Sequence, residues 1–378
     1  MKTQLLGGLT PTRFLRDYWQ KKPLLVRAAI PGFSGLVSRS ALFALAGRDD
    51  AESRLVRRQA GKWLLEHGPF RRGAFGALPE RRWTLLVQGL NLLLPAADAL
   101  LRRFDFIPFS RIDDVMISYA APGGGVGPHI DSYDVFLLQG EGRRRWRTSR
   151  QRDLSLDPRA PVRVLKSFRA EHEWVLEPGD MLYLPPGVAH EGVALETCTT
   201  YSIGFRAPAA AELAAGFLDF LHERIALSGR YADPGLRPSA RPGEIPAAMV
   251  SDAMRRLAGI RWDRRDVVDF LGEYLSTPKA IVQFDRPVRP VSSGRFAAQV
   301  RKRGLRLDAR TLLLYRGGRF YANGEPVHAV GATARALATL ADRRFLPADE
   351  AGGSPHGESA QLFYTWYCDG YIHAGSSP

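Results

Sequence analysis

The chain has 378 residues, 45% of them hydrophobic, so it is long enough for two or three domains and can bury a core in each. Its 53 lysines and arginines against 39 acids give a formal charge of +14. That charge favours a negatively charged partner such as a ribonucleoprotein, although an arginine-rich solvated surface gives the same count. Two cysteines exclude a disulfide framework, and no apolar run approaches the length of a membrane-spanning helix. We therefore expect a cytoplasmic protein.

The first hundred or so residues predict two helices that flank a pair of strands. Thr12 is a candidate N-cap for the first helix, and Pro23 is expected to stop it. Pro95 opens the second helix, because proline is tolerated in the first helical turn. The predicted elements are, in order, a helix at 12–22, strands at 63–67 and 83–87, and a helix at 95–104.

The next hundred residues predict a β-rich domain. Short apolar runs alternate there with turns rich in glycine and proline, a pattern typical of a barrel or jelly roll, the class that includes the cupins. The runs that we interpret as strands are 114–119, 135–138, 143–148, 173–176, 181–184 and 198–205.

Two histidines and one carboxylate in this domain form a candidate metal site. His129 and Asp131 lie in GPHID, and His190 lies much later, in PPGVAHEG. If a strand runs through 129–133, side chains at i and i+2 point to the same face, so the first pair can bind one ion side by side. His190 must then come from a distant strand that folds back beside them. This ligand set is the facial triad of non-haem Fe(II) oxygenases. The alternative is two unrelated surface histidines, since a bare H-x-D also occurs by chance.

Longer motifs around these residues resemble a known family. GGGVGPHIDSYDVFLLQGEGRRRW, EPGDMLYLPPGVAHEG and YSIGFRAP, with FLRDYWQKKPLLVRAAIPGF near the start, are similar to the bacterial ribosomal oxygenases of the JmjC/cupin superfamily. Within that family they resemble the hydroxylases that act on an arginine of large-subunit ribosomal protein sixteen. The resemblance runs along the whole chain.

The resemblance implies an α+β fold in three parts and a set of cofactors. The parts are a double-stranded β-helix (jelly-roll/cupin, JmjC-type) catalytic barrel at 1–208, a helical dimerisation segment at 209–276 and a winged-helix-like domain at 277–378. It also implies Fe(II) bound by His129, Asp131 and His190, with 2-oxoglutarate and O2 as co-substrates. A homodimer and a basic ribosomal protein substrate follow from the same resemblance.

In the resembled family a cation holds the far carboxylate of 2-oxoglutarate, and Arg144 is our choice for it. An arginine fork can bind a carboxylate through two hydrogen bonds. Strand alternation places Arg143 and Arg145 on the opposite face, where solvent or phosphate is the expected neighbour. The candidates for a further hydrogen bond to the co-substrate are Ser118, which we prefer, Thr200 and Ser202.

A substrate arginine needs an acid near the iron, because a buried unpaired cation is costly. The sequence does not rank the candidates, and Tyr133 is expected to line the same pocket. We interpret Asp180 as a turn residue. The acids considered for the guanidinium are Asp113, Asp114, Asp134 and Glu191.

The last part of the chain predicts helices and a small hairpin. The helices near 209–227, 247–257 and 264–275 are apolar enough to form a dimer surface, although packing between domains explains them equally well. After residue 277, two helices and a hairpin across a Gly-Gly turn fit a winged helix. Those elements are helices at 293–302 and 332–340 and strands at 311–315 and 319–322.

The leading hypothesis is therefore an Fe(II)- and 2-oxoglutarate-dependent protein hydroxylase. One alternative is a cupin-type sensor joined to a winged-helix DNA-binding module, a regulator without catalysis. Such a regulator needs neither a complete metal triad nor a cation for a dicarboxylate. A second alternative, a cupin isomerase or dioxygenase acting on a small molecule, leaves the two additional domains without a purpose.

Overall fold

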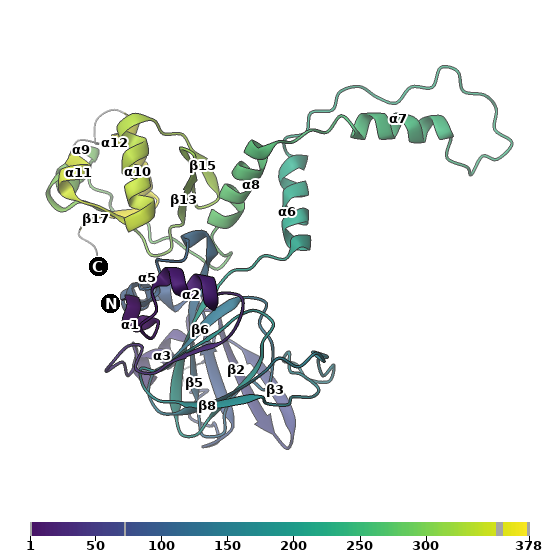
Figure 1. Ribbon diagram of the computed structural model, residues 1–378. Coiled ribbons are helices and arrows are strands. Elements are labelled where there is room, and N and C mark those ends of the chain that lie inside the picture. Colours follow the sequence, from purple (N-terminus) through teal and green to yellow (C-terminus); the bar gives the residue numbers. More distant parts are fainter. Residues whose placement is uncertain (1, 72, 353–357, 376–378) are drawn as a thin grey trace. The chain divides into compact units, whose positions relative to one another are not determined.

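A computed structural model describes residues 2–71, 73–352 and 358–375 (Figure 1). The chain forms two compact units. The first comprises Met1–Ala207, Pro278–Thr311 and Asp342–Pro378, and the second comprises Pro208–Thr277 and Leu312–Ala341. Within the described ranges, no helix is both long enough and apolar enough to cross a membrane.

The first unit is built on the two antiparallel sheets of a double-stranded β-helix. The larger sheet has the strand order β1-β9-β6-β11-β5-β4-β2-β3, and the smaller has the order β10-β7-β8. Every strand expected in the β-rich domain is present, and β10 is the distant strand that was expected to carry His190, although its bounds were not predicted. The bounds are β1 (Leu24–Val26), β2 (Ser53–Gln59), β3 (Lys62–His67), β4 (Trp83–Val87), β5 (Ile112–Ala120), β6 (Asp134–Gln139), β7 (Arg144–Ser149), β8 (His172–Leu176), β9 (Met181–Leu184), β10 (Ala189–Ala194) and β11 (Cys198–Phe205).

Strand alternation in β6 separates the outer core from the inside of the barrel. Phe136 and Leu138 belong to the large core that the N-terminal helices cover. Val135 and Leu137 instead pack in a second cluster with Trp146 of the facing sheet. Because successive side chains of a strand point to opposite faces, one buried strand serves both cores. The interior face is the one that bears the candidate site.

The N-terminal helices cover the large core, and the first of them differs from the sequence prediction. Its N-cap is Thr10 rather than Thr12: the Thr10 hydroxyl accepts from the backbone N–H of Arg13 at 3.2 Å, and Pro11 occupies the first helical position. The helix also ends earlier than expected, at Asp17. The helices are α1 (Lys2–Leu5), α2 (Pro11–Asp17), α3 (Arg39–Leu45), α4 (Leu90–Leu93) and α5 (Pro95–Arg102), and η1 (Phe109–Arg111) is a 3-10 turn.

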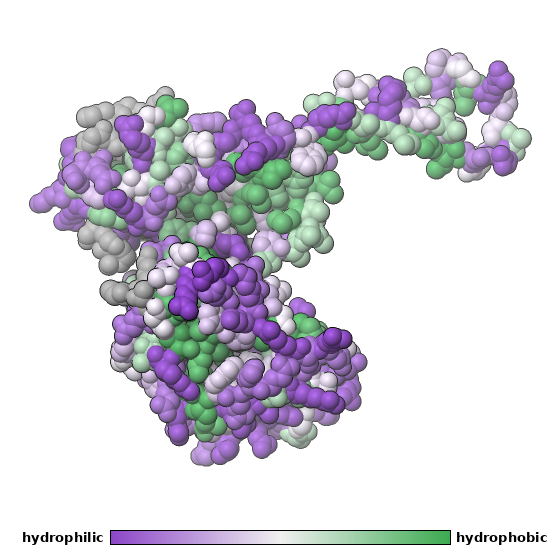
Figure 2. Space-filling view, viewed as in Figure 1, coloured by the Kyte–Doolittle hydropathy of each residue, from purple (hydrophilic) through white to green (hydrophobic). Residues whose placement is uncertain are grey.

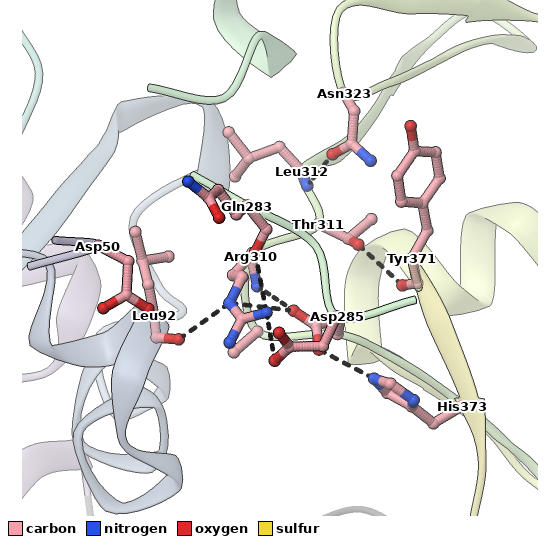
Figure 3. A network of polar contacts seen from close by, with 12 residues as sticks. Asp50, Leu92, Gln283, Asp285, Arg310, Thr311, Leu312, Asn323, Tyr371 and His373 are labelled. Carbon is pink, nitrogen blue, oxygen red and sulfur yellow. Dashed lines mark hydrogen bonds and ion pairs between the residues drawn. The ribbon is translucent and has the colours of Figure 1, made fainter. Parts of the chain in front are cut away.

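Two later segments of the chain return to the first unit, and Arg310 fixes one of them. Its guanidinium donates to the carbonyl oxygens of Leu92 in α4 (3.4 Å) and Gln283 (3.0 Å) and to the Asp285 carboxylate (2.8 Å), as Figure 3 shows. A three-stranded sheet of order β16-β12-β17 lies in the same segments. The elements are α9 (Ser293–Arg303), β12 (Leu305–Leu307), β16 (Phe345–Leu346), α11 (Ala348–Gly352), α12 (Glu358–Cys368) and β17 (Ile372–Ala374).

The second unit contains the predicted hairpin and the later predicted helices, except the helix expected at 293–302, which is α9 of the first unit. β13 pairs with β14 across Gly317 and Gly318, both of which have positive φ, as a tight hairpin turn requires. The helix expected to reach Leu227 ends at His222, where the chain tightens into a 3-10-type turn: the N–H of Arg224 donates to the Leu221 carbonyl three residues earlier. The elements are α6 (Ala210–His222), α7 (Ala247–Leu257), α8 (Arg264–Ser276), β13 (Leu313–Arg316), β14 (Arg319–Ala322), β15 (Glu325–Val327) and α10 (Gly331–Arg343).

Candidate metal and co-substrate site

One cavity of about 320 Å³ inside the barrel collects most of the candidate residues. Its size is that of a small-molecule site. Three chemical groups share its wall: a histidine–carboxylate set, a buried arginine with hydroxyl groups, and a pair of acids. The polar and aromatic residues of its wall include Thr84, Asp113, Asp114, Ser118, His129, Asp131, Tyr133, Arg144, Trp146, His190 and Ser202.

A reciprocal backbone bridge holds the two histidines side by side. The N–H of His129 donates to the His190 carbonyl at 2.9 Å, and the N–H of His190 donates back to the His129 carbonyl at 2.8 Å. Their rings lie 4.2 Å apart between centroids. The Asp131 carbonyl accepts from the N–H of Gly187, which ties the third residue to the turn before β10.

The side chains of these three residues converge on one point. Nε2 of His129 lies 4.0 Å from Oδ1 of Asp131, and Nε2 of His190 lies 3.6 Å from Oδ2. All three candidate ligand atoms lie within 4.8 Å of one another. Metal bonds to nitrogen and oxygen are about 2.0–2.2 Å long, so one ion can bridge such separations.

The imidazoles are oriented for metal binding by their second nitrogens. Nδ1 of His129 lies 2.9 Å from the Gly127 carbonyl, and Nδ1 of His190 lies 2.9 Å from the Val188 carbonyl. A carbonyl accepts only from a protonated nitrogen, so each Nε2 carries a free lone pair. Burial, with a smaller contribution from His129, lowers the pKa of His190 to about 4. This imidazole is therefore neutral near pH 7, as a metal ligand must be.

His129 and Asp131 do not lie on one continuous strand, as the sequence had suggested, whereas His190 does come from a distant strand, β10. The strand predicted through 129–133 is wrong: β6 begins only at Asp134, and His129 forms an isolated bridge with His190. The glycines and prolines of the preceding loop favour turns over extended pairing. The side chains of His129 and Asp131 nevertheless meet, because the bridge and the Gly187 hydrogen bond replace the strand.

Arg144 is buried in the wall of the cavity with unpaired donors. Its side chain comes from the first residue of β7, is 4% exposed and donates from Nη1 to the Ser118 hydroxyl at 2.9 Å. Its Nε and Nη2 are buried and find no hydrogen-bond partner among the described residues. Burying such a cation without an anion is costly, so the arrangement fits a carboxylate ligand. Arg143, in contrast, is exposed and pairs with Glu196 at 3.0 Å.

Two further polar atoms in this wall were missed by the sequence analysis. The Thr84 hydroxyl and the Trp146 indole N–H are buried and have no partner among the described residues. Ser202 also lines the cavity. Thr200, an alternative considered for the co-substrate, donates instead to the Gln139 side chain at 3.2 Å. Trp146 was within reach of sequence reasoning, because it stands at i+2 from Arg144 on the same strand face.

The structure separates the four acids proposed for a guanidinium. Asp113 and Asp114 line the cavity. Asp134 is fully buried elsewhere, where it accepts from Tyr183 (2.6 Å) and Gln20 (3.0 Å). Glu191 forms an ion pair with Arg147. Only the first two therefore face the metal-binding set.

Tyr133 lines the cavity as expected, and Asp180 occupies a turn. Burial, followed by the nearby Asp131, Asp114 and Asp113, raises the pKa of Tyr133, so its hydroxyl stays a donor. The Asp180 carboxylate accepts from the backbone of Ala28 (2.9 Å) and Glu177 (3.0 Å), which fits the structural role expected for it.

Family models match both ends of this architecture. A JmjC domain matches residues 99–213, and a ROXA-like winged helix matches residues 259–373. The chain is 36% identical over 316 residues to the ribosomal protein uL16 3-hydroxylase of Escherichia coli, covering 83% of this chain and 84% of that protein. It is 41% identical over 212 residues to a probable ribosomal oxygenase of Haemophilus influenzae, covering 55% and 52% of the two chains.

Solved structures of the ribosomal oxygenase YcfD from Escherichia coli match nearly the whole chain. One superposes with a TM-score of 0.84 at 34% identity, covering 97% of this chain and 98% of that one. Another, with a TM-score of 0.82 at 35% identity and the same coverage, is a complex with cobalt and 2-oxoglutarate.

Asp131→Ala should abolish binding of one divalent ion while leaving the fold intact, because Asp131 is a partly exposed cavity residue outside the packed core. Anaerobic titration calorimetry with Fe(II), or titration with Co(II), measures the loss. Asp153→Ala, which removes an exposed carboxylate, is the matched control. Undiminished metal binding by Asp131→Ala would rule out the triad.

Proposed function

We propose that this chain, which belongs to the ribosomal oxygenase family of JmjC-domain proteins, is an Fe(II)- and 2-oxoglutarate-dependent hydroxylase of an arginine side chain in ribosomal protein uL16. The observation that carries the proposal is the single cavity, which unites a metal-ligand set, an unpaired buried guanidinium and an acid pair. The name of the Escherichia coli relative points to carbon 3 as the hydroxylated atom.

In this proposal each wall of the cavity has a separate role. His129, Asp131 and His190 would hold Fe(II), which with 2-oxoglutarate and O2 supplies the oxidising chemistry for an unactivated carbon. Arg144 would bind the far carboxylate of 2-oxoglutarate through its free Nε and Nη2, with Ser118 orienting the guanidinium. The apolar side chains Val135 and Leu137 would keep bulk water from the reacting carbon.

The acid pair would recognise the substrate. A guanidinium that enters the cavity loses its hydration and needs an anionic acceptor. Asp113 and Asp114 face the same space as the metal set, and Tyr133 can donate or accept beside them. We propose Asp114 as the main acceptor because it is the more deeply buried of the two, with a side chain 7% exposed against 27% for Asp113.

The alternative of a sensor and DNA-binding regulator without catalysis fits the cavity less well. A winged helix suits either function. A regulator has no need for a buried arginine with unpaired donors next to a complete ligand set, because both features reduce stability in the absence of ligands. Cytoplasmic location is part of the proposal, since uL16 is a ribosomal protein.

Arg144→Ala should raise the KM for 2-oxoglutarate by roughly tenfold to a hundredfold, because a buried charge-assisted contact contributes about 1.5–3 kcal/mol. Arg143→Ala, whose side chain is exposed and paired with Glu196, should change that KM little. Steady-state kinetics of 2-oxoglutarate turnover compares the two variants. Equal effects would show that strand alternation does not select Arg144.

A peptide from uL16 that contains the target arginine should gain about 16 Da when it is incubated with the enzyme, iron, 2-oxoglutarate and O2. The reason is that hydroxylation inserts one oxygen atom into a C–H bond. Mass spectrometry measures the gain, and the Arg→Ala peptide is the control. Oxidation of both peptides, or of neither while 2-oxoglutarate is consumed, would contradict this substrate.

We also propose three functional parts, a barrel at 1–208, a helical segment at 209–276 and a C-terminal domain at 277–378, and that the helical segment forms a homodimer. Val250, Met254 and Leu257 of α7 lie at i, i+4 and i+7, on one helical face, and are 48%, 66% and 60% exposed. Figure 2 shows hydrophobic residues along one side of this segment. Leu218 of α6 is exposed as well, at 66%. A second copy of the chain is the occupant that we propose for this surface.

Met254→Asp and Leu257→Asp should shift the full-length protein from dimer to monomer, because each places a charge in an apolar interface. Sedimentation velocity at micromolar concentration measures the shift. Val288→Asp is the control, since Val288 is 97% exposed and lies outside the helical segment. A wild-type protein that sediments as a monomer would refute the dimer.

A further inference from the structure

Lys279 contacts both acids of the cavity wall. Its Nζ lies 2.8 Å from Oδ1 of Asp113 and 3.2 Å from Oδ2 of Asp114. This lysine comes three residues after the end of α8, yet it belongs to the same compact unit as the barrel. Neither the metal-binding set nor the Arg144 wall accounts for it.

The lysine reaches the acid pair from outside the cavity. Asp113 and Asp114 line the cavity, whereas Lys279 is not among the described residues that line it. The ion pair and the backbone N–H of Gly89 (3.2 Å) both use Oδ2 of Asp114. Arg206, a second cation, lies 3.8 Å from Asp113. A ligand inside the cavity can therefore approach Asp114 without displacing Lys279.

The charge on Lys279 matters because Asp114 is deeply buried. Burial raises the pKa of Asp114 above its ordinary value, and Asp113 adds to the rise, which Lys279 opposes without cancelling it. Burial acts to lower the pKa of Lys279 itself, but Asp114 and Asp113 outweigh it and raise the pKa. The lysine therefore stays charged, and it is the largest influence that favours the ionised form of Asp114. Without it, two adjacent carboxyl groups would share a proton more readily.

The segment that carries Lys279 is fixed close by. Gln283, four positions later, accepts from Arg310, and the same guanidinium donates to the Leu92 carbonyl of α4 (Figure 3). α4 begins directly after Gly89, the other donor to Asp114. In addition, the Lys279 carbonyl accepts from the N–H of Val282 at 2.9 Å, which closes a turn. Lys279 is thus held in place by its backbone as well as by its charge.

From this geometry we infer that Lys279 is a positioning residue whose ion pairs with Asp113 and Asp114 hold the Asp114 carboxyl group toward the cavity and favour its negative charge, and that it thereby sets the preference for a cationic substrate side chain. The inference rests on the proposed function, since it assigns the recognition of the guanidinium to Asp114. It extends the substrate site to a residue outside the barrel.

The experiment measures binding of the uL16 peptide to the full-length enzyme loaded with iron and 2-oxoglutarate in the absence of O2. Lys279→Met should weaken binding of the arginine peptide by about tenfold or more, because Asp114, the acceptor of the guanidinium, loses the cation that favours its negative charge. Lys279→Arg should restore binding. Lys302→Met, which removes an exposed lysine of α9, is the matched control. Lys279→Gln provides a second neutral variant in case the methionine variant does not fold.

Two readouts separate positioning from general damage to the structure. Affinity for 2-oxoglutarate should be the same in all variants, because Arg144 lies on another wall. A peptide with glutamine in place of the target arginine should bind wild type and Lys279→Met equally, since it carries no charge for Asp114 to recognise.

The possible failures differ from one another. If wild type does not bind the arginine peptide, the proposed function falls and this inference falls with it. If wild type binds and the neutral variants bind equally well, this inference alone is overturned. Tighter binding by Lys279→Met would mean that the lysine competes with the substrate, and it would also overturn the inference.

Discussion

The candidate site depends on the two backbone hydrogen bonds between His129 and His190. They join a glycine-rich loop to β10. Apart from this isolated bridge, the loop and β10 are not paired as neighbouring strands of a sheet. β10 in turn pairs with β7, with Ala194 opposite Arg144 and His190 opposite Thr148. The bridge therefore sets the position of the two histidines of the candidate metal site relative to the buried arginine. A shift of one residue in this register would turn His190 out of the cavity, because alternate strand residues face opposite sides.

The cavity holds opposite charges on different walls, and this separation sorts its ligands. Arg144 has two buried donors without partners, whereas Asp113 and Asp114 present carboxylates on another wall. A dicarboxylate is attracted to the first wall and repelled by the second, and a guanidinium behaves in the opposite way. The low exposure of both walls strengthens these preferences. In the proposed function, one small cavity would thus bind an anionic co-substrate on one wall and a cationic side chain on another.

Sequence reasoning found the parts of the site that local patterns encode. Strand alternation placed Arg144 and Arg143 on opposite faces of β7, and the family resemblance indicated Arg144. The strand pattern around 135–138 and 198–205 predicted the barrel walls, because alternation depends only on neighbours. It required a strand at His190 but could not give its bounds, because AHEGVA in β10 has no apolar run, and it considered a strand at Asp131 where the chain forms a loop. It also missed Lys279, since a contact between residues 165 positions apart leaves no local signature.

The return of the chain to the barrel explains how so distant a residue can act at the site. After the helices of the second unit, the segment 278–311 rejoins the first unit, and Arg310 binds it to the backbone of α4. Closing a long loop costs conformational entropy once, and every later contact in the same segment is then nearly free of that cost. Lys279 benefits in this way, because the hydrogen bonds of Arg310 already hold its segment near Gly89 and Asp114. In the role that we infer for Lys279, a residue outside the barrel tunes a buried carboxyl group inside it, and the region matched by the winged-helix model would take part in substrate recognition.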